Sequence, residues 1–581
     1  MFGLIIKKTK EKNKLADLVT EGVFSYSDCF FAQTVLSAEF HAASEEALAI
    51  AYLFFASRMG HICVDYSNSA KQLVDPQFSE LLNNHSDKED ILNSIHSGFL
   101  LLQKRFQSKN KDYSPIVIDQ QRAYLQINWK NEQQLILLIN QLLSSGSENS
   151  FDTKKFQMYV KRLFQEKLIS EVQTHIINQL ISHRLFILSG GPGTGKSYLI
   201  RYIIETFLMA QVKPLYIAVV APTGKAAMLL QEKLYASFSS QWLDQITFGT
   251  LHSAIKYKQL KAETVVLPYD LIVVDEASMI ELPLMVELLS KIKGNGKLVL
   301  VGDAYQLPPV EQGDIFYDLC FYPQVQKTHS IEFLNKPYRY HNETLYAFSQ
   351  AILMKDLAKS FELIQDNHSI NWRKIDGAEL AYNRLREVAL ENFPHPSFEP
   401  FDIVSLLQTI NRFRILSALN KGAFGCEVLN TLIFKALHKD IKPKMWWAVP
   451  IIVTRNDKEL NLFNGMMGMA VGQYESDNWF SSDTKVYFPG YKEDLIVISL
   501  PMIQAYEKGY CLTVHKVQGS EFDHVTLILP DASEVFGNEL LYTAVTRAKK
   551  EISLFANEDT LEKLIKKGNR KISGLQSKKT E

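Results

Sequence analysis

The stretch LFILSGGPGTGKSYLIRYII, at residues 185–204, decides the fold of this chain. Its apolar start predicts a buried strand, the glycine-rich segment a loop, and the residues after the lysine a helix. In this setting backbone N–H groups wrap a phosphate, the lysine reaches the β- and γ-phosphates, and the hydroxyl of Ser197 binds Mg²⁺. The stretch therefore predicts an ATP site. Its residues are Gly190, Gly191, Pro192, Gly193, Thr194, Gly195, Lys196 and Ser197.

Further apolar runs extend this pattern to a sheet. They lie at residues 215–220, 271–274 and 298–301. Continuous apolar strands that alternate with helical segments are typical of a parallel sheet covered on both faces. A second region of this kind ends the chain, and a segment rich in Gly and aromatic residues at about 445–510 interrupts it. We expect an α/β protein with parallel-sheet domains at 155–335 and 336–565, the second of which carries a small β insertion.

The two ends of the chain differ from these domains. Residues 1–145 have a mostly helical pattern with one strand-like pair at 115–127 and no catalytic motif. The small polar residues 144–150 predict a linker, so we expect a helical N-terminal domain before it. Residues 566–581 are rich in lysine and predict a flexible basic tail.

Composition limits the classes of function. The 581 residues contain 63 Lys and Arg against 64 Asp and Glu, a formal net charge of -1, so any site for nucleic acid must be a local groove. The five cysteines lie far apart without a CxxC motif, which argues against a disulfide framework or a zinc site and favours a reducing cytoplasm. No apolar stretch is long enough to span a bilayer, so we expect a cytoplasmic protein without a membrane partner.

Polar residues follow two more strands of the first predicted sheet. DEAS at 275–278 follows the third strand, where Asp275 would hold Mg²⁺ and Glu276 would accept a proton from the attacking water. The fourth strand leads into GDAYQLPPV at 302–310, which brings the amide of Gln306 to the same edge of the sheet. An amide at that position can respond to the γ-phosphate. We therefore expect a Mg²⁺-dependent ATPase.

The ordered motifs of the chain resemble those of superfamily 1 helicases. Besides the stretches above, the series consists of Gln173, APTGKAA at 221–227, TLH at 250–252, YRY at 338–340, LTVHKVQGSEF at 512–522 and YTAVTRA at 542–548. The motif sequences are most similar to those of the RecD family, the alpha subunits of exodeoxyribonuclease V, and the similarity covers about residues 31–555. This resemblance implies two RecA-like P-loop domains and ATP-driven movement along single-stranded DNA from 5′ to 3′.

The resemblance also implies roles for residues in the matching motifs. Gln173 would read the adenine base. Arg339 and Arg547 would reach the γ-phosphate from the second domain. Gly519 and Glu521 would border the nucleotide. A second set would line the path of the DNA strand, largely through phosphate contacts. These residues are Pro222, Thr223, Lys225, His252, Thr513 and His515.

Some of these residues have an ordinary alternative. His252 and His515 could each be a buried histidine satisfied by backbone groups. Lys225 could be a solvated lysine at the start of a helix. The pair Trp446-Trp447 offers stacking faces for bases, but an aromatic pair ahead of a β segment is more often part of a core.

An assembly is implied as well. The resemblance suggests a heterotrimer with a RecB-like helicase-nuclease and a RecC-like subunit, which acts on single strands and duplex ends in recombinational repair of double-strand breaks. Residues 1–145 would dock on the RecC-like subunit, and an insertion at 256–269 is a candidate wedge that splits the duplex. Two alternatives are a stand-alone RecD-like 5′ to 3′ helicase and a non-catalytic DNA-binding scaffold subunit. The intact set of ATPase residues argues against the scaffold.

Overall fold

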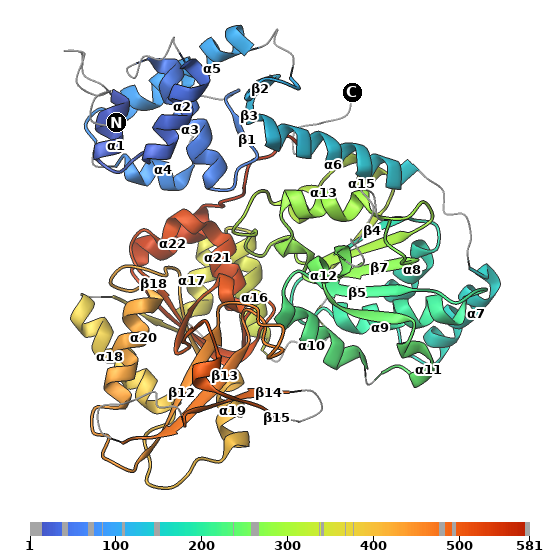
Figure 1. The fold of residues 1–581 in the computed structure, drawn as a ribbon, viewed down its shortest axis with the longest axis vertical. Helices are drawn as coiled ribbons and strands as arrows, with labels where there is room; N and C mark the ends of the chain where they lie inside the picture. The colour runs from blue at the N-terminus through green and yellow to red at the C-terminus, as the bar shows by residue number, and fades with distance from the viewer. Residues whose placement is uncertain are drawn as a thin grey trace.

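The computed structural model describes most of the chain. The described residues are 14–37, 44–67, 75–83, 85–106, 111–144, 151–235, 237–256, 266–335, 337, 342–365, 368–375, 377–475, 483–490 and 495–575. They form a helical N-terminal domain, two α/β lobes and a β-rich insertion in the second lobe (Figure 1). This confirms the expected α/β class with two parallel sheets. None of the helices in these ranges is long and apolar enough to cross a membrane.

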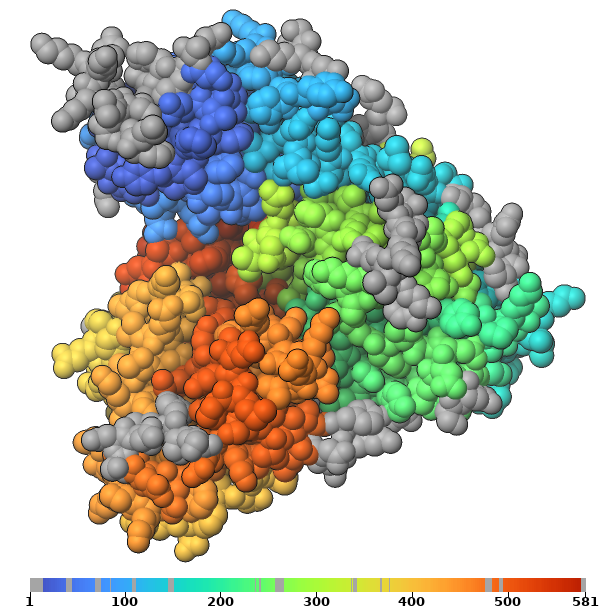
Figure 2. Space-filling view, viewed as in Figure 1, coloured from blue at the N-terminus to red at the C-terminus, as the bar shows by residue number. Residues whose placement is uncertain are grey.

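A helical layer and a small antiparallel sheet form the N-terminal domain. Its elements are α1 (Lys14–Thr20), α2 (Tyr26–Leu36), α3 (Glu45–Arg58), β1 (Cys63–Asp65), α4 (Pro76–Leu81), α5 (Lys88–Phe106), β2 (Ile116–Asp119) and β3 (Arg122–Leu125). The apolar helix α3 fills the core, and its N-cap Ser44 accepts a hydrogen bond from the N–H of Ala47. Figure 2 shows the domain, in blue, resting on both lobes.

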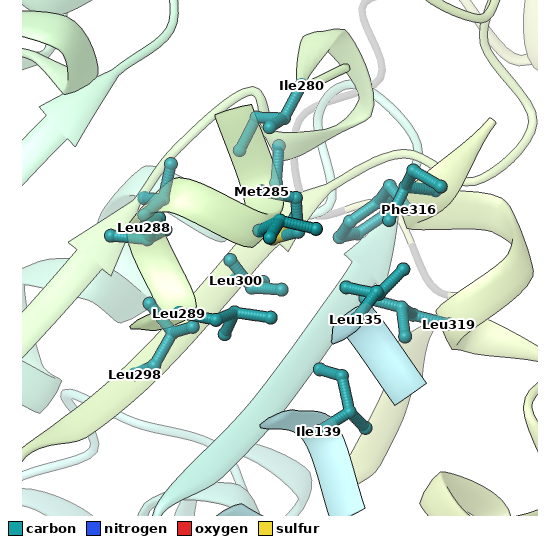
Figure 3. Packing of buried hydrophobic residues seen from close by; sticks show 14 of the residues in the cluster. Leu135, Ile139, Ile280, Met285, Leu288, Leu289, Leu298, Leu300, Phe316 and Leu319 are labelled. Atoms are coloured by element: carbon teal, nitrogen blue, oxygen red, sulfur yellow. The ribbon is translucent and has the colours of Figure 1, made fainter. Parts of the chain in front are cut away.

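The next helix, α6 (Gln126–Ser144), packs into the first lobe. Its residues Leu135 and Ile139 join a cluster with Leu298 and Leu319 of that lobe (Figure 3). The apolar stripe of this helix packs mainly against the first lobe and also meets Val117 and Tyr124 of the N-terminal sheet, so we place the domain boundary near the start of α6 and not at 145.

The first lobe contains a six-stranded parallel sheet in the order β6-β5-β7-β8-β4-β9. The strands are β4 (Leu185–Gly190), β5 (Ile217–Ala221), β6 (Ile246–Thr250), β7 (Leu271–Val274), β8 (Lys297–Gly302) and β9 (Ile331–Leu334). The helices are α7 (Thr153–Gln165), α8 (Glu171–Leu180), α9 (Lys196–Met209), α10 (Gly224–Tyr235), α11 (Ser240–Leu243), α12 (Leu251–Ile255), α13 (Leu282–Ser290), α14 (Ile315–Cys320) and α15 (Pro323–Lys327). Strands β4, β5, β7 and β8 are buried along their whole length, as their continuous apolar runs predicted. Of the candidate wedge, residues 257–265 lie outside the described residues.

The second lobe repeats the architecture with five parallel strands in the order β10-β19-β18-β11-β17. The strands are β10 (Ile370–Arg373), β11 (Phe413–Ser417), β17 (Cys511–Thr513), β18 (Phe522–Leu529) and β19 (Ala548–Ala556). The helices are α16 (Glu343–Leu353), α17 (Leu357–Gln365), α18 (Ala378–Asn392), α19 (Ile403–Arg412), α20 (Cys426–Leu437), α21 (Gly537–Val545) and α22 (Glu558–Lys566).

An antiparallel five-stranded sheet forms the insertion, in the order β15-β14-β13-β12-β16. Its strands are β12 (Trp446–Val453), β13 (Met467–Gln473), β14 (Lys485–Pro489), β15 (Leu495–Ser499) and β16 (Tyr506–Lys508). Trp447 is buried in a core cluster with residues of the second lobe, and Trp446 is half-buried. The core alternative for Trp447 is therefore confirmed.

Residues 567–575, which we name the C-terminal strap, pass between the N-terminal domain and the lobes. Lys571, Ser573 and Leu575 are buried, and the strap bonds to all three parts of the molecule. The expected flexible tail is therefore wrong for residues 566–575. Carboxylates and carbonyl groups elsewhere in the fold pair with its cations, and a basic composition cannot show such partners. Residues 576–581 lie outside the described residues.

Candidate ATP site between the lobes

A cleft of 1780 Å³ opens between the two lobes. It brings together most of the residues that the sequence predicted for an ATP site. Those that line it are Gln173, Pro192, Gly193, Thr194, Gly195, Lys196, Ser197, Asp275, Glu276, Gln306, Gly519, Glu521 and Arg547. Arg339 falls at residues 338–341, which lie outside the described residues.

The glycine-rich loop joins β4 to α9. Gly193 and Gly195 have φ angles of 74° and 83°, a left-handed conformation that side chains disfavour. Gly195 caps α9 without a side-chain hydrogen bond, so the first amides of this helix are left for an anion. The Nζ of Lys196 donates to the carbonyl oxygens of Gly190 (2.5 Å) and Gly191 (3.0 Å). A loop of this shape is built to enclose a phosphate group.

Two acidic residues follow β7. The Glu276 N–H donates to Asp275 Oδ1 at 3.0 Å, and Glu276 itself has a φ of 52°, which is strained for a residue with a side chain. Burial raises the pKa of Asp275, and the nearby Lys196 opposes this shift. Burial also raises the pKa of Glu276; Asp275 adds to that shift, and Arg547 opposes it. A raised pKa makes Glu276 a better proton acceptor than an ordinary carboxylate.

The segment after β8 is held by both lobes. Asp303 Oδ2 accepts hydrogen bonds from Gln306 Nε2 (3.1 Å) and from the hydroxyl of Tyr542 in the second lobe (3.0 Å). Gln306 Oε1 is buried and has no hydrogen-bond partner in the described part of the chain. The amide is thus oriented by Asp303, and its oxygen is left to accept a hydrogen bond.

Two more hydrogen bonds join this segment to the second lobe. The N–H of Leu307 donates to Thr543 Oγ1 at 2.8 Å, and Gln518 Nε2 donates to the Leu307 carbonyl at 3.0 Å. Sequence reasoning did not select Asp303, Gln518, Tyr542 or Thr543 as site residues. All four lie inside quoted motifs, and that position was the signal that could have found them.

Arg547 reaches the cleft from the end of the second lobe's α21. Its guanidinium donates to the carbonyls of Thr543 and Ser520, each at 3.2 Å, and to Thr546 Oγ1 at 3.3 Å. Only 3% of the residue is exposed, and the hydrogen-bond partners of its guanidinium in the described part of the chain are neutral. A buried cation with neutral partners can attract an anion in the cleft.

The remaining nucleotide residues have structural partners. Gln173 forms a capping box with Ser170: its Oε1 accepts from the Ser170 N–H at 2.9 Å. Glu521 is exposed and lies 3.8 Å from Lys549. Gly519, at a φ of 75°, faces Glu276: a Cβ built there would lie 3.6 Å from Glu276 Oε1.

The predicted DNA residues divide into two groups. Lys225 lines the cleft and is half-buried, and burial, aided by Arg414, lowers its pKa to about 8. The others are absent from the cleft lining. These are Pro222, Thr223, His252, Thr513 and His515. His252 is exposed, so the buried-histidine alternative is wrong for it. His515 is half-buried, and burial, aided by Lys571, lowers its pKa to about 4.

Three family profiles match parts of the chain. The profile of the RecBCD enzyme subunit RecD N-terminal domain matches residues 20–124, which end just before α6. An AAA domain profile matches residues 173–312, and a UvrD-like helicase C-terminal domain profile matches residues 508–555.

Curated relatives extend the similarity over most of the chain. RecBCD enzyme subunit RecD of Buchnera aphidicola is 27% identical over 515 residues, or 79% of this chain and 83% of that protein. The same subunit of Mycolicibacterium smegmatis is 29% identical over 571 residues, or 94% and 95%. The ATP-dependent RecD2 DNA helicase of Deinococcus radiodurans is 29% identical over 441 residues, or 74% of this chain but 54% of that protein. The chain therefore belongs to the RecD family of P-loop superfamily 1 helicases and is a homologue of the RecBCD subunit.

Proposed function

We propose that this chain is an ATP-driven 5′ to 3′ DNA helicase subunit of a RecBCD-type complex that acts in the repair of double-strand breaks. One observation carries the proposal: Lys196, Glu276 and Gln306 of the first lobe line the same cleft as Arg547 of the second. Groups from two lobes around one triphosphate would couple its hydrolysis to motion between the lobes.

Each group has a defined task in hydrolysis. Lys196 would exchange its two carbonyl partners for phosphate oxygens, and Glu276 would accept the proton of the attacking water. The orphan oxygen of Gln306 would orient that water. Arg547 would stabilise the charge that develops on the γ-phosphate.

The residues present also fit a Mg²⁺ ion. Asp275 is a half-buried carboxyl whose pKa is raised by burial, and a divalent cation would offset the cost of ionising it. Ser197, in the first turn of α9, lines the same cleft and would be the second protein ligand. When bound, Mg²⁺ would neutralise charge on the phosphates.

Movement along DNA would follow from opening and closing of the cleft. The DNA residues of the first lobe would be Pro222, Thr223, Lys225 and His252, and those of the second Thr513 and His515. Because Gln518 and Thr543 bond to the backbone of Leu307, a change at the γ-phosphate would reach the segment that contains Thr513 and His515. Alternating grip on the phosphate backbone would then produce steps.

Partners are proposed from the relatives. The two RecD relatives are named as subunits of the RecBCD enzyme, so this chain would assemble with RecB-like and RecC-like subunits. The N-terminal domain would dock on the RecC-like subunit. A stand-alone role is less well supported, since the match covers only 54% of the RecD2 helicase.

Hydrolysis and unwinding assays test this proposal. Single-stranded DNA should stimulate ATP hydrolysis by the purified chain, and the chain should unwind a duplex with a 5′ tail but not one with a 3′ tail. The Lys196→Ala variant is the inactive control. Absence of stimulation, or unwinding of the 3′-tailed duplex alone, would contradict the proposal.

A further inference from the structure

The C-terminal strap contacts the segment that carries Gln306. We propose that Arg570 of the strap is a positioning residue for ATP hydrolysis, which holds the Gln306 loop in place and links it to the N-terminal domain. This inference rests on the role proposed above for Gln306. We define the Gln306 loop as residues 306–313, between β8 and α14.

Arg570 forms an ionic bridge between the lobes. Its Nη1 lies 2.8 Å from Asp314 Oδ2 of the first lobe, and its Nε lies 3.0 Å from Glu539 Oε1 of the second. The two carboxylate side chains are only 3% and 5% exposed. The guanidinium lies 4.3 Å from the ring centroid of Tyr317, and Nη1 also donates to the carbonyl of Gln306 at 3.3 Å. One side chain thus contacts both lobes and the backbone of the proposed water-orienting residue.

The next residue of the strap holds the rest of the loop. The Nζ of Lys571 donates to three consecutive carbonyl oxygens, those of Pro309, Val310 and Glu311. These groups are the acceptors that a loop would otherwise expose to water, and here a buried ammonium satisfies them. These three carbonyl groups of the loop therefore depend on the strap for a hydrogen-bond donor.

Beyond Lys571 the strap enters the N-terminal domain. The Ile572 N–H donates to His61 Nδ1 at 3.0 Å, and the Ile62 N–H donates to the Ile572 carbonyl at 2.9 Å. The other ring nitrogen of His61 lies 2.8 Å from Asp75 Oδ2, which fixes the orientation of the imidazole. A displacement of this domain would therefore pull on the strap.

The Gln306 loop also contacts the N-terminal domain directly. Gln312 Nε2 donates to Ser57 Oγ at 3.0 Å, and the N–H of Gly313 donates to the carbonyl of Gly60 at 2.9 Å. Ser57 lies in the last turn of α3, and Gly60 follows this helix. The loop is thus fixed at one end by groups of the second lobe and at the other by the N-terminal domain, with the strap along its length.

Removal of Arg570 would act on hydrolysis more than on nucleotide binding. Asp314 and Glu539 would lose their shared cation, and the Gln306 carbonyl would lose a donor, while the glycine-rich loop would keep all its contacts. The expected result is a kcat that falls by about tenfold with a KM for ATP within about twofold, as when an interaction of the transition state is lost.

The test uses the full chain with saturating single-stranded DNA. The kcat, the KM for ATP and the thermal midpoint are measured for the wild type, Arg570→Ala and the control Lys567→Ala, which removes an exposed cation of the same strap. A third variant, Arg570→Ala/Asp314→Asn/Glu539→Gln, also removes the unpaired buried charges. This triple variant should recover much of the thermal midpoint that Arg570→Ala loses. Its kcat should stay low, because the hydrogen bond from Arg570 to the Gln306 carbonyl is still absent.

Two results would overturn the inference. One is a kcat of Arg570→Ala equal to that of Lys567→Ala; the other is recovery of both kcat and the midpoint in the triple variant, which would mean a purely structural role. If wild-type hydrolysis is not stimulated by DNA, the proposed function fails, and the same kcat comparison on basal hydrolysis still decides the role of Arg570.

Discussion

The two lobes share a strand–loop–helix unit, but the loops of the two units differ in conformation and in their hydrogen bonds. In the first lobe, β4 leads through left-handed glycines into α9. In the second, β11 leads into α20 through residues 418–425, which bond to themselves: Ser417 Oγ donates to the Phe424 carbonyl at 2.8 Å and the Gly425 N–H to the Gly422 carbonyl at 3.0 Å. In the proposed site, the same topology therefore encloses the nucleotide in one lobe and supplies side chains to it from the other.

The largest difference in ATP hydrolysis should come from replacing a lysine by alanine in each of these two loops. Lys196→Ala removes the phosphate-binding ammonium and should abolish ATP hydrolysis, a loss of about 10³-fold or more, with the fold intact. Lys421→Ala changes an exposed lysine of the second loop and should leave the rate unchanged. Steady-state ATPase assays of both variants measure the difference. Comparable losses in the two would mean that both loops handle phosphate.

The next largest effect on ATP hydrolysis should come from a residue of the second lobe. Arg547→Ala should slow hydrolysis by about 10³-fold and leave nucleotide binding intact, as for the loss of an arginine finger. Lys550→Ala, which removes an exposed cation from β19, the strand that follows Arg547, is the control. Single-turnover hydrolysis and titration with a fluorescent ATP analogue separate the two steps. A defect confined to affinity would remove Arg547 from catalysis.

The sequence revealed the loop residues of the first lobe better than the residues that the second lobe brings to them. The loop glycines, Lys196 and Asp275 follow strands of one sheet, so their spacing in the sequence makes them recognisable. The partners of Gln306 come from a different lobe: Tyr542 reaches Asp303 only because the two lobes pack together. Residues 567–575 looked flexible for the same reason, since their carboxylate and carbonyl partners are far away in sequence. A strand-and-loop pattern reports local chemistry, and contacts between domains depend on the packing of the whole chain.

The assignment of α6 to the first lobe predicts a cost in stability. Leu135 is fully buried in the core of that lobe, so Leu135→Ala should lower the free energy of unfolding by about 2–5 kcal/mol. Leu137, on the same helix, is 55% exposed, and Leu137→Ala should cost under about 0.5 kcal/mol. Denaturant unfolding with hydrogen exchange of β8 measures both. If exchange increased in α3 and not in β8, α6 would belong to the N-terminal domain.

The smallest effect concerns Lys225, which lies in the cleft near Arg414 of the second lobe. A bound phosphate would favour the charged lysine and raise its pKa from about 8 toward its ordinary value. The DNA-bound state would then hold more protons than the free state above pH 8. The Kd for single-stranded DNA should therefore rise about three- to tenfold between pH 7.5 and 9. His515, with a pKa of about 4, does not titrate in this window. Lys225→Ala should flatten the slope, and Lys233→Ala on the same helix should not. A pH dependence of the Kd seen with ADP and not with single-stranded DNA would assign Lys225 to the nucleotide and not to the DNA strand.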